Sequence, residues 1–328
     1  MKYIDMHCDT VMLLYRKAAD NRNMYEQNDL MIDFRRMQAG DALAQWFAVF
    51  LPPEKGITTR NIYPVGDDEK YIAATRKIIM DNVAAHDDVI RMACTAEDIE
   101  NNLADGRMSA VLTMEDGRAV LGKLENIRRF YDMGFRACSL TWNAHNCFGA
   151  PNSSDPEIMN EGLTEFGKDG VRYMQELGML VDVSHLSDGG FRDVADICTK
   201  PFVATHSNAR ALCPHQRNLT DEQIRILADA GGVTGMNFYP SFLNADMSAG
   251  YADAAVIAKH ARHIVNTGGI AVCGIGTDFD GFEGKNEIMS SDRMPLLIDA
   301  LKAEHFTEDE IEKIFWKNVL RVMRDAIK

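Results

Sequence analysis

The stretch Phe166–His185, FGKDGVRYMQELGMLVDVSH, decides the fold because it holds one complete helix-to-strand unit. Phe166–Leu177 has the apolar spacing of an amphipathic helix, and Gly178 stands where a glycine commonly ends a helix. The apolar run Met179–Val183 then predicts a buried strand, and His185 follows it almost at once. A helix that leads directly into a strand indicates parallel strands joined by crossover helices.

The same unit recurs along the chain. Glycines also follow the predicted helices that end at Met133 and Ala230. Strands are expected at Tyr3–Met6, Ala44–Phe50, Ala110–Met114, Ala137–Leu140, Met179–Val183, Phe202–Ala204, Val233–Phe238 and Val272–Ile275. Helices are expected at Lys70–Ala85, Gly122–Met133, Phe166–Leu177, Asp221–Ala230 and Asp253–Thr267, and Thr307 begins a capping box for a terminal helix at about 307–325.

Eight strand candidates with helices between them favour an α/β fold of the TIM-like (β/α)8 barrel type over an open doubly wound sheet. No GxGxxG motif follows an early strand, which weakens the dinucleotide-binding alternative. We expect one barrel domain over residues 1–328, in which the loop-like segment Pro52–Asp68 forms part of a lid.

The composition excludes several classes of protein. The chain has 328 residues and a net charge of -14, which argues against nonspecific binding to nucleic acid or to an anionic membrane. Asp5, His7 and Asp9 interrupt the apolar segment that a signal peptide needs, and no run of about 18 uncharged apolar residues predicts a membrane span. The seven cysteines are scattered without a CxxC pair, which favours reduced thiols and a cytoplasmic location.

Polar residues follow the predicted strands, at the end where a TIM barrel carries its active site. They are His7 and Asp9 after the first strand, Glu115 after the run ending at Met114, His185, His206, and Asp278. Side chains alternate along a strand, so His7 and Asp9 share one face, while Cys8 points away and is expected to pack. Histidines with carboxylates and without cysteine are typical of a hydrolytic metal site rather than of a structural zinc site.

Each of these residues also has an ordinary structural interpretation. A single histidine after a strand is more often a hydrogen-bonded residue than a ligand, and an aspartate before a glycine is often part of a turn. Asp278 and Asp280 have the same strand parity, so the pattern does not choose between them. Four other histidines stand in helical or polar contexts and are expected on the surface or in structural positions: His86, His260, His263 and His305.

Several segments together carry a resemblance to a known family. They are DMHCDT (5–10), MEDG (114–117), LTWNAHN (140–146), LTEFGKDGVRYMQELGMLVDVSHLS (163–187), PFVATHSNARAL (201–212), RNLTDEQI (217–224), GMNFY (235–239), GIGTDFDG (274–281) and NVLRV (318–322). In this order they resemble the membrane (renal) dipeptidase family, peptidase family M19, a group of metal-dependent hydrolase barrels. The likeness spans nearly the whole chain, and its motifs are highly specific in combination.

The resemblance implies two Zn2+ ions per chain and a set of site residues. The implied ligands are His7 and Asp9 for one ion and His185 and His206 for the other, with Glu115 bridging both and counted among the catalytic residues. The resemblance also implies Arg217 as a substrate-binding residue, and it selects Asp278 over Asp280 as the catalytic aspartate, which also contacts substrate. The implied partner is a small dipeptide, the expected assembly is a homodimer, and no nucleic acid or membrane partner is expected.

One segment departs from the mammalian pattern of that family. There a substrate-contacting histidine follows the Leu-Thr pair, but Trp142 stands at that position here, followed by Asn143. His145, three positions on, is either its substitute or an ordinary loop histidine, and the sequence leaves both open. Asn143 and Tyr239 are further candidates for substrate contacts.

Three hypotheses about function follow. The first is a zinc dipeptidase in which a metal-bridging hydroxide attacks the peptide bond of free dipeptides, L-D dipeptides included. In it, Asp278 moves a proton to the leaving amine, and Arg217 pairs with the terminal carboxylate. The second keeps the metal site but acts on a lactam, a lactone or an N-acyl amino acid. The third is a catalytically inactive binding barrel, which the complete set of ligands disfavours.

Overall fold

The computed structural model describes residues 1–27, 29–52, 67–246 and 248–328. Within these residues, eight parallel strands form a barrel in the order β2-β1-β10-β8-β7-β6-β5-β4, and the pairing of β2 with β4 closes it. The strands are β1 (Tyr3–Cys8), β2 (Ala42–Phe50), β4 (Met108–Glu115), β5 (Phe135–Ser139), β6 (Leu180–Asp182), β7 (Val203–Ala204), β8 (Val233–Met236) and β10 (Cys273–Ile275). Each coincides with a strand expected from the sequence, so the TIM-like (β/α)8 fold is confirmed.

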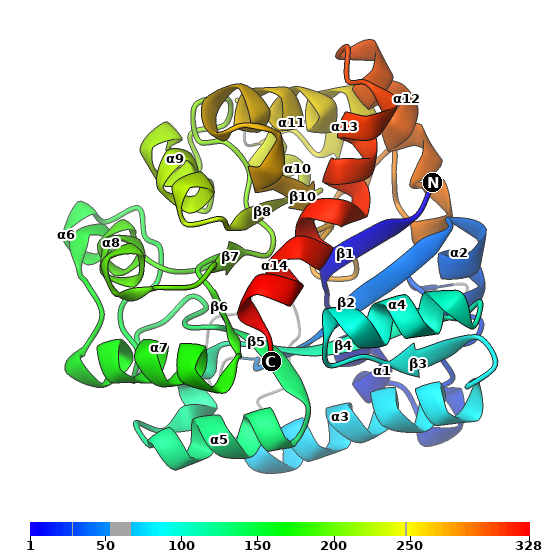
Figure 1. Cartoon of the computed structure of the whole chain (residues 1–328), viewed down its shortest axis with the longest axis horizontal. Coiled ribbons are helices and arrows are strands. Elements are labelled where there is room, and N and C mark those ends of the chain that lie inside the picture. The colour runs from blue at the N-terminus through cyan, green and yellow to red at the C-terminus, as the bar shows by residue number, and fades with distance from the viewer. Residues whose placement is uncertain (28, 53–66, 247) are drawn as a thin grey trace.

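Helices connect the strands and cover the outside of the barrel (Figure 1). Those expected from the sequence are α3 (Asp68–Ala85), α5 (Leu124–Asp132), α7 (Glu165–Leu177), α9 (Asp221–Asp229) and α11 (Ala254–Gly268). The others are α1 (Thr10–Arg16), α2 (Phe34–Ala39), α4 (Ala96–Ala104), α6 (Pro156–Asn160), α8 (Asp188–Ile197), α10 (Pro240–Leu243) and α12 (Pro295–Ala303). In α7, the Thr164 side chain accepts a hydrogen bond from the Gly167 N–H, and Gly178 ends the helix in the left-handed conformation at φ 85°.

Three short strands were not expected from the sequence. A short strand, β3 (Ile90–Met92), pairs with the start of β4, and β9 (Tyr251–Ala252) pairs with β11 (Lys285–Asn286) in a separate small sheet. The terminal helix begins at the expected Thr307 capping box, but it consists of α13 (Glu308–Glu312), a π-helical segment (Lys313–Lys317) and α14 (Asn318–Ala326). Residues 53–66 of the expected lid lie outside the described residues.

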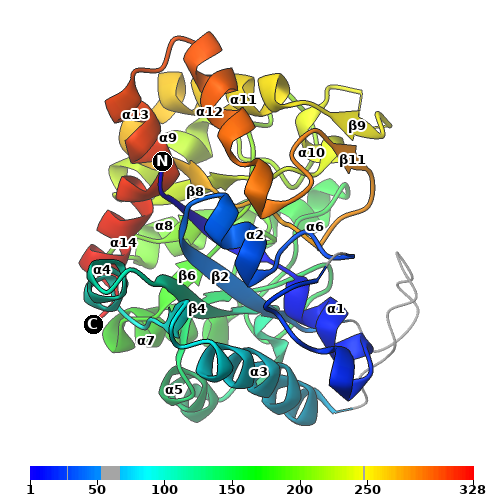
Figure 2. The same ribbon diagram turned by 90° about the vertical axis from the view of Figure 1, so that its right-hand side faces the viewer.

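Apolar side chains fill the barrel interior, and α14 closes the end of the barrel where the strands begin. One buried cluster collects residues from seven strands: Ile4 and Met6 (β1), Leu43, Ala44 and Trp46 (β2), Val111 (β4), Ala137 (β5), Leu180 (β6), Val203 (β7) and Val233 (β8). Val319, Val322 and Met323 of α14 belong to the same cluster. Figure 2 shows α14 on one side of the barrel and α1 with β9 and β11 on the other. The carboxyl ends of the strands, opposite α14, are therefore left for the functional site.

An irregularity in β1 aims its last residues. The pairing of β1 with β2 shifts register between Asp5 and Cys8. Met6 packs in the interior cluster, whereas Cys8, which has the same strand parity, packs in the outer core. A β-bulge of this kind re-aims the side chains that follow it. His7 is thereby turned towards the upper end of the barrel, and Cys8 packs away from it, as expected.

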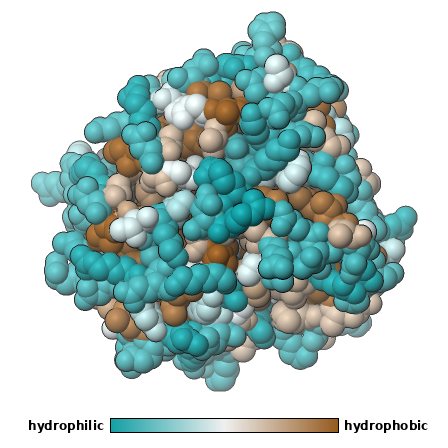
Figure 3. All heavy atoms as spheres, viewed as in Figure 1, coloured by the Kyte–Doolittle hydropathy of each residue, from teal (hydrophilic) through white to brown (hydrophobic). Residues whose placement is uncertain are grey.

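The surface seen in Figure 3 is mostly hydrophilic, with apolar residues in small separate patches. The described ranges contain no helix that is both long enough and apolar enough to cross a membrane.

Candidate active site

Four strand ends bring the five predicted ligands together at the carboxyl end of the barrel. His7 lies at the end of β1, Asp9 immediately precedes α1, and Glu115 is the last residue of β4. His185 and His206 follow β6 and β7. All five are buried, and the imidazole rings of His7 and His206 stack with centroids 3.8 Å apart.

The two oxygens of Glu115 face different groups. Its Oε1 lies 2.8 Å from His185 Nε2 and 3.6 Å from His206 Nε2. Its Oε2 lies 3.5 Å from His7 Nε2, which in turn is 3.6 Å from Asp9 Oδ2. One carboxylate thus stands between a His185–His206 pair and a His7–Asp9 pair. This is the arrangement that a carboxylate bridging two cations requires.

Unpartnered buried atoms indicate that these residues fit a metal. Among the described residues, neither His7 Nε2 nor Asp9 Oδ1 has a hydrogen-bond partner, although both are buried. A Cβ on Gly281 would come within 2.2 Å of Asp9 Oδ2 and of Asp278 Oδ1, so any side chain there would fill the space that these oxygens face. In each of two groups of residues, one donor atom per residue lies within 4.8 Å of the others. The first group is His7, Glu115 and His206, and the second is His7, Asp9 and Asp278. Imidazole and carboxylate donors suit zinc and similar divalent ions.

The electrostatics of the cluster also favour a cation. Burial raises the pKa of Glu115 to about 7 and the pKa of Asp278 to about 6. Burial opposes protonation of His7, but the carboxylates of Glu115 and Asp9 raise its pKa well above the usual value. Burial lowers the pKa values of His185 and His206, which keeps both imidazoles neutral, the form that binds metal.

A buried carboxylate fixes the orientation of His206. The Thr205 hydroxyl donates to Asp182 Oδ2 at 2.6 Å, so it accepts from the N–H at His206 Nδ1, 2.8 Å away. Asp182 also accepts from the Thr205 N–H and from the N–H and hydroxyl of Ser184. This chain of hydrogen bonds leaves His206 Nε2 without a proton and aimed at Glu115, as a metal ligand needs.

The structure separates Asp278 from Asp280. Both oxygens of Asp280 are used at a distance from the cluster, since Oδ2 accepts from the Thr10 hydroxyl at 2.6 Å and Oδ1 from the Met31 N–H at 2.8 Å. Asp278 Oδ2 accepts from the Asn237 side chain at 2.9 Å, and its Oδ1 lies 3.9 Å from His7 Nε2. Backbone conformation does not distinguish the two, since Asp278 has φ 63° and Asp280 has φ 64°. Only Asp278 of the two lines the cavity described next.

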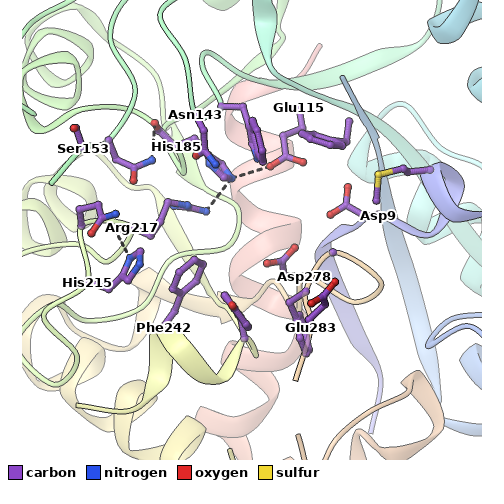
Figure 4. Close-up of a pocket in the computed structure, with 18 of the residues that line it drawn as sticks. Asp9, Glu115, Asn143, Ser153, His185, His215, Arg217, Phe242, Asp278 and Glu283 are labelled. Carbon is purple, nitrogen blue, oxygen red and sulfur yellow. Dashed lines mark hydrogen bonds and ion pairs between the residues drawn. The ribbon is translucent and has the colours of Figure 1, made fainter. Parts of the chain in front are cut away.

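A cavity of about 570 Å3 opens above the cluster (Figure 4). Arg217 is fully buried at one side of it, with Asp9, Asp278 and Glu283 on the opposite side. Its guanidinium lies 3.0 Å from His185 Nε2, and its Nε has no hydrogen-bond partner within the described residues. No carboxylate in the described part of the chain forms an ion pair with Arg217. Burial lowers the pKa of Arg217 to about 10, so it stays charged at neutral pH.

Of the other residues predicted to contact substrate, two line the cavity and one does not. Asn143 and Tyr239 line the cavity, and so does Trp142, whose indole packs edge-on against Phe50. His145 does not reach the cavity, because its Nε2 pairs with Glu161 at 2.9 Å and its side chain is 52% exposed. This position fits the alternative of an ordinary loop histidine and gives no support to His145 as a substitute for the family's histidine.

Several lining residues were not anticipated from the sequence. They are Met12, Phe50, Asn152, Ser153, Ser154, His215, Gln216, Phe242, Gly281, Phe282 and Glu283. Most stand in loops beyond the strand ends, where neither helical nor strand periodicity applies. His215 had a signal that could have found it, since it lies two residues before Arg217 in the same segment.

Comparison with known proteins agrees with this geometry. Residues 1–328 match the family described as Membrane dipeptidase (Peptidase family M19). Dipeptidase aclJ of Aspergillus oryzae is 30% identical, over 95% of this chain and 73% of its own length.

Two crystal structures are also similar. The metallopeptidase dipeptidase AC, of family M19, has a TM-score of 0.90 at 27% identity and covers 100% of this chain and 99% of its own. A metallopeptidase from Rhodobacter sphaeroides, bound to a phosphinate mimic of the dipeptide L-Ala-D-Ala, has a TM-score of 0.89 at 26% identity, with 99% of each chain covered. The chain therefore belongs to the membrane dipeptidase family, peptidase family M19, and is a metal-dependent hydrolase that acts on dipeptides.

Proposed function

We propose that the protein is a two-zinc dipeptidase that cleaves the peptide bond of free dipeptides, L-D dipeptides included. The ligands in this proposal are His7 and Asp9 for one ion and His185 and His206 for the other, with Glu115 shared. The unpartnered atoms of His7 and Asp9 and the two-sided contacts of Glu115 support this assignment. The zinc ions would polarise the peptide carbonyl and lower the pKa of the attacking water.

The observation that carries the proposal is the buried Arg217, which lacks a carboxylate partner among the described residues. A buried guanidinium is costly unless an anion pairs with it. The free carboxylate of a dipeptide is such an anion, and the planar guanidinium can bind it through two parallel hydrogen bonds. The requirement for a carboxylate one residue beyond the scissile bond would restrict the enzyme to very short peptides.

Asp278 is the proposed proton carrier. Asn237 donates to its Oδ2, which leaves Oδ1 facing the ligand cluster. In our proposal Oδ1 accepts the proton of the attacking water and passes it to the leaving nitrogen. Burial raises the pKa of Asp278 to about 6, which suits a group that first accepts and then donates a proton near neutral pH.

The same ligands could serve a lactam, a lactone or an N-acyl amino acid as substrate. These compounds lack the free ammonium group of a dipeptide. Asp9 and Asp278 line the side of the cavity opposite Arg217, which gives the cavity carboxylates at one end and a guanidinium at the other. This polarity favours a zwitterionic dipeptide.

L-D dipeptides enter the proposal through the R. sphaeroides relative, whose bound ligand mimics L-Ala-D-Ala. The test is a hydrolysis screen of the zinc-loaded protein against a dipeptide library that includes L-D pairs, with lactams and N-acyl amino acids at equal concentration. We expect dipeptides to be cleaved fastest. Cleavage of the lactams or N-acyl amino acids alone would overturn the proposal in favour of the second hypothesis.

We further propose a cytoplasmic location and a homodimer, which both come from the sequence and the family likeness. Cell fractionation tests the location, and light scattering of the purified protein tests the homodimer. A secreted protein or a monomer at working concentration would contradict them.

A further inference from the structure

His215 is a cavity residue to which the proposed mechanism gives no role. It is half-buried, it lines the cavity on the side of Arg217, and Figure 4 shows it beside Phe242. Its ring packs against Phe242 with centroids 4.5 Å apart. The Arg217 guanidinium carbon lies 5.5 Å from the centroid of the same phenyl ring. The two polar groups therefore share one apolar support.

The hydrogen bonding of His215 fixes which ring nitrogen carries the proton. The backbone N–H of Arg217 donates to His215 Nδ1 at 3.1 Å, so Nδ1 acts as an acceptor. The proton of the neutral ring must then be on Nε2. Burial, together with the charges of Arg217 and Arg210, lowers the pKa of His215 to about 4. The ring is neutral at any pH where the enzyme would be assayed, with one fixed donor.

That donor has no acceptor within the described part of the chain. No hydrogen bond found there uses His215 Nε2, just as none uses Arg217 Nε. The neutral donor of His215 and the charged guanidinium of Arg217 thus both belong to residues that line one side of the cavity. A carboxylate offers two oxygens with about four lone-pair sites and can accept from both residues at once.

We propose that His215 is a specificity-determining residue, whose Nε2–H donates a hydrogen bond to the C-terminal carboxylate of the dipeptide beside Arg217. The inference rests on the proposed dipeptidase function. Arg217 supplies the charge, and His215 supplies a neutral donor that fixes the orientation of the carboxylate. A dipeptide amide, which offers one oxygen and no negative charge, would gain little from His215.

Two substitutions separate the donor from the structural role of the ring. In His215→Asn the side-chain oxygen can replace Nδ1 as the acceptor for the Arg217 N–H, but the side chain does not reach as far as Nε2. In His215→Gln the amide nitrogen reaches the Nε2 position and can donate there. His145→Asn is a matched control, because His145 is exposed and pairs with Glu161.

The experiment measures kcat and KM of the zinc-loaded enzymes for a free dipeptide and its C-terminal amide, together with Tm. We expect His215→Asn to raise KM for the free dipeptide about tenfold, the effect of one hydrogen bond to a charged group, with kcat and Tm unchanged. KM for the amide should not change, His215→Gln should recover most of the loss, and His145→Asn should match the wild type. Calorimetric binding of a phosphinate dipeptide mimic should show the same order.

An equal rise in KM for both substrates, or a His215→Gln enzyme no better than His215→Asn, would overturn the inference. So would an effect confined to kcat, or a fall in Tm that accounts for the loss. Normal dipeptide kinetics in His215→Asn would overturn the inference and leave the dipeptidase function intact. A wild-type enzyme that neither binds the mimic nor cleaves dipeptides would overturn both.

Discussion

Replacing Arg217 with methionine removes the only charge that the proposal assigns to the substrate carboxylate while keeping an unbranched side chain of similar length. The guanidinium is fully buried, and its Nε has no partner among the described residues. Methionine adapts to irregular apolar surroundings, and Phe242 already provides an apolar contact at this position. The substitution therefore tests substrate binding with little disturbance of the packing.

The expected loss follows from the hydrogen bonds that Arg217 can make. Hydrogen bonds to a charged group contribute about 1.5–3 kcal/mol each, so a bidentate pair contributes about 3–6 kcal/mol. We expect kcat/KM for free dipeptides to fall by roughly 10²–10⁴. For a C-terminally amidated dipeptide, which carries no negative charge to pair, the fall should stay within about tenfold.

Stability should move in the other direction. Burial lowers the pKa of Arg217 from its usual value to about 10, which corresponds to roughly 3 kcal/mol against the charged form. Removing the charge relieves this cost, although the contact with His185 Nε2 at 3.0 Å and the longer hydrogen bonds to Ser207 and to the His206 carbonyl are lost. We expect the metal-free variant to unfold at the same Tm or up to ~4 °C higher for a chain of this length.

Steady-state kinetics on both substrates and thermal unfolding followed by circular dichroism provide the test. The zinc content must be measured in parallel, so that loss of metal is not mistaken for loss of binding. Equal losses on the free and the amidated dipeptide would refute the assigned role of Arg217. A fall in Tm together with the loss of activity would refute the claim that the buried charge of Arg217 lowers the stability of the folded protein.

Three further predictions follow from the ligand cluster. Asp9→Asn should lose one zinc ion and most of the activity, whereas Cys8→Ala should keep both ions, because the Cys8 side chain packs away from the site. Elemental analysis counts the zinc ions in each variant. Equal zinc contents in the two variants would contradict the assignment of Asp9 as a ligand. Asp278→Asn should keep both ions but lower kcat by about 10²–10⁴ with little change in KM, and a loss seen only in KM would argue against proton transfer. Burial raises the pKa of Glu115 to about 7, and the carboxylates of Glu115 and Asp9 raise the pKa of His7. Both groups must therefore release protons when metal binds. Zinc affinity should therefore rise with pH through about 7 and continue to rise above it, because the pKa of His7 is raised well above its usual value. Calorimetry in buffers of different ionisation enthalpy should detect the proton release, and an affinity that falls over this range would contradict the ligand set.

The sequence predicted the barrel and the cluster because both depend on local pattern. Each barrel strand is a short apolar run, and the polar residue after it lies at the carboxyl end whatever the rest of the chain does. His7 and Glu115 illustrate this, since both lie at the carboxyl end of a buried strand, and His7 Nε2 is 3.5 Å from Glu115 Oε2. The short strand β3 was missed because two of its three residues are only half-buried, which weakens the apolar signal.

Other features depend on partners far away in the chain. Strand parity could not separate Asp278 from Asp280, because Asp280 is held by Thr10 and Met31, about 250 residues or more away in the sequence. His215 owes its environment to Phe242, which stands in helix α10. His145 stands close to Trp142 in the sequence, but its loop turns it to the surface. Loop geometry of this kind has no periodic signature.

The most direct test is a crystal structure of the zinc-loaded protein with a phosphinate mimic of a dipeptide, recorded at the zinc absorption edge. We predict two anomalous peaks, one between His7 and Asp9 and one between His185 and His206, with Glu115 shared. The carboxylate of the mimic should pair with Arg217. A single peak, ligands outside this set, or a carboxylate bound away from Arg217 would contradict the account.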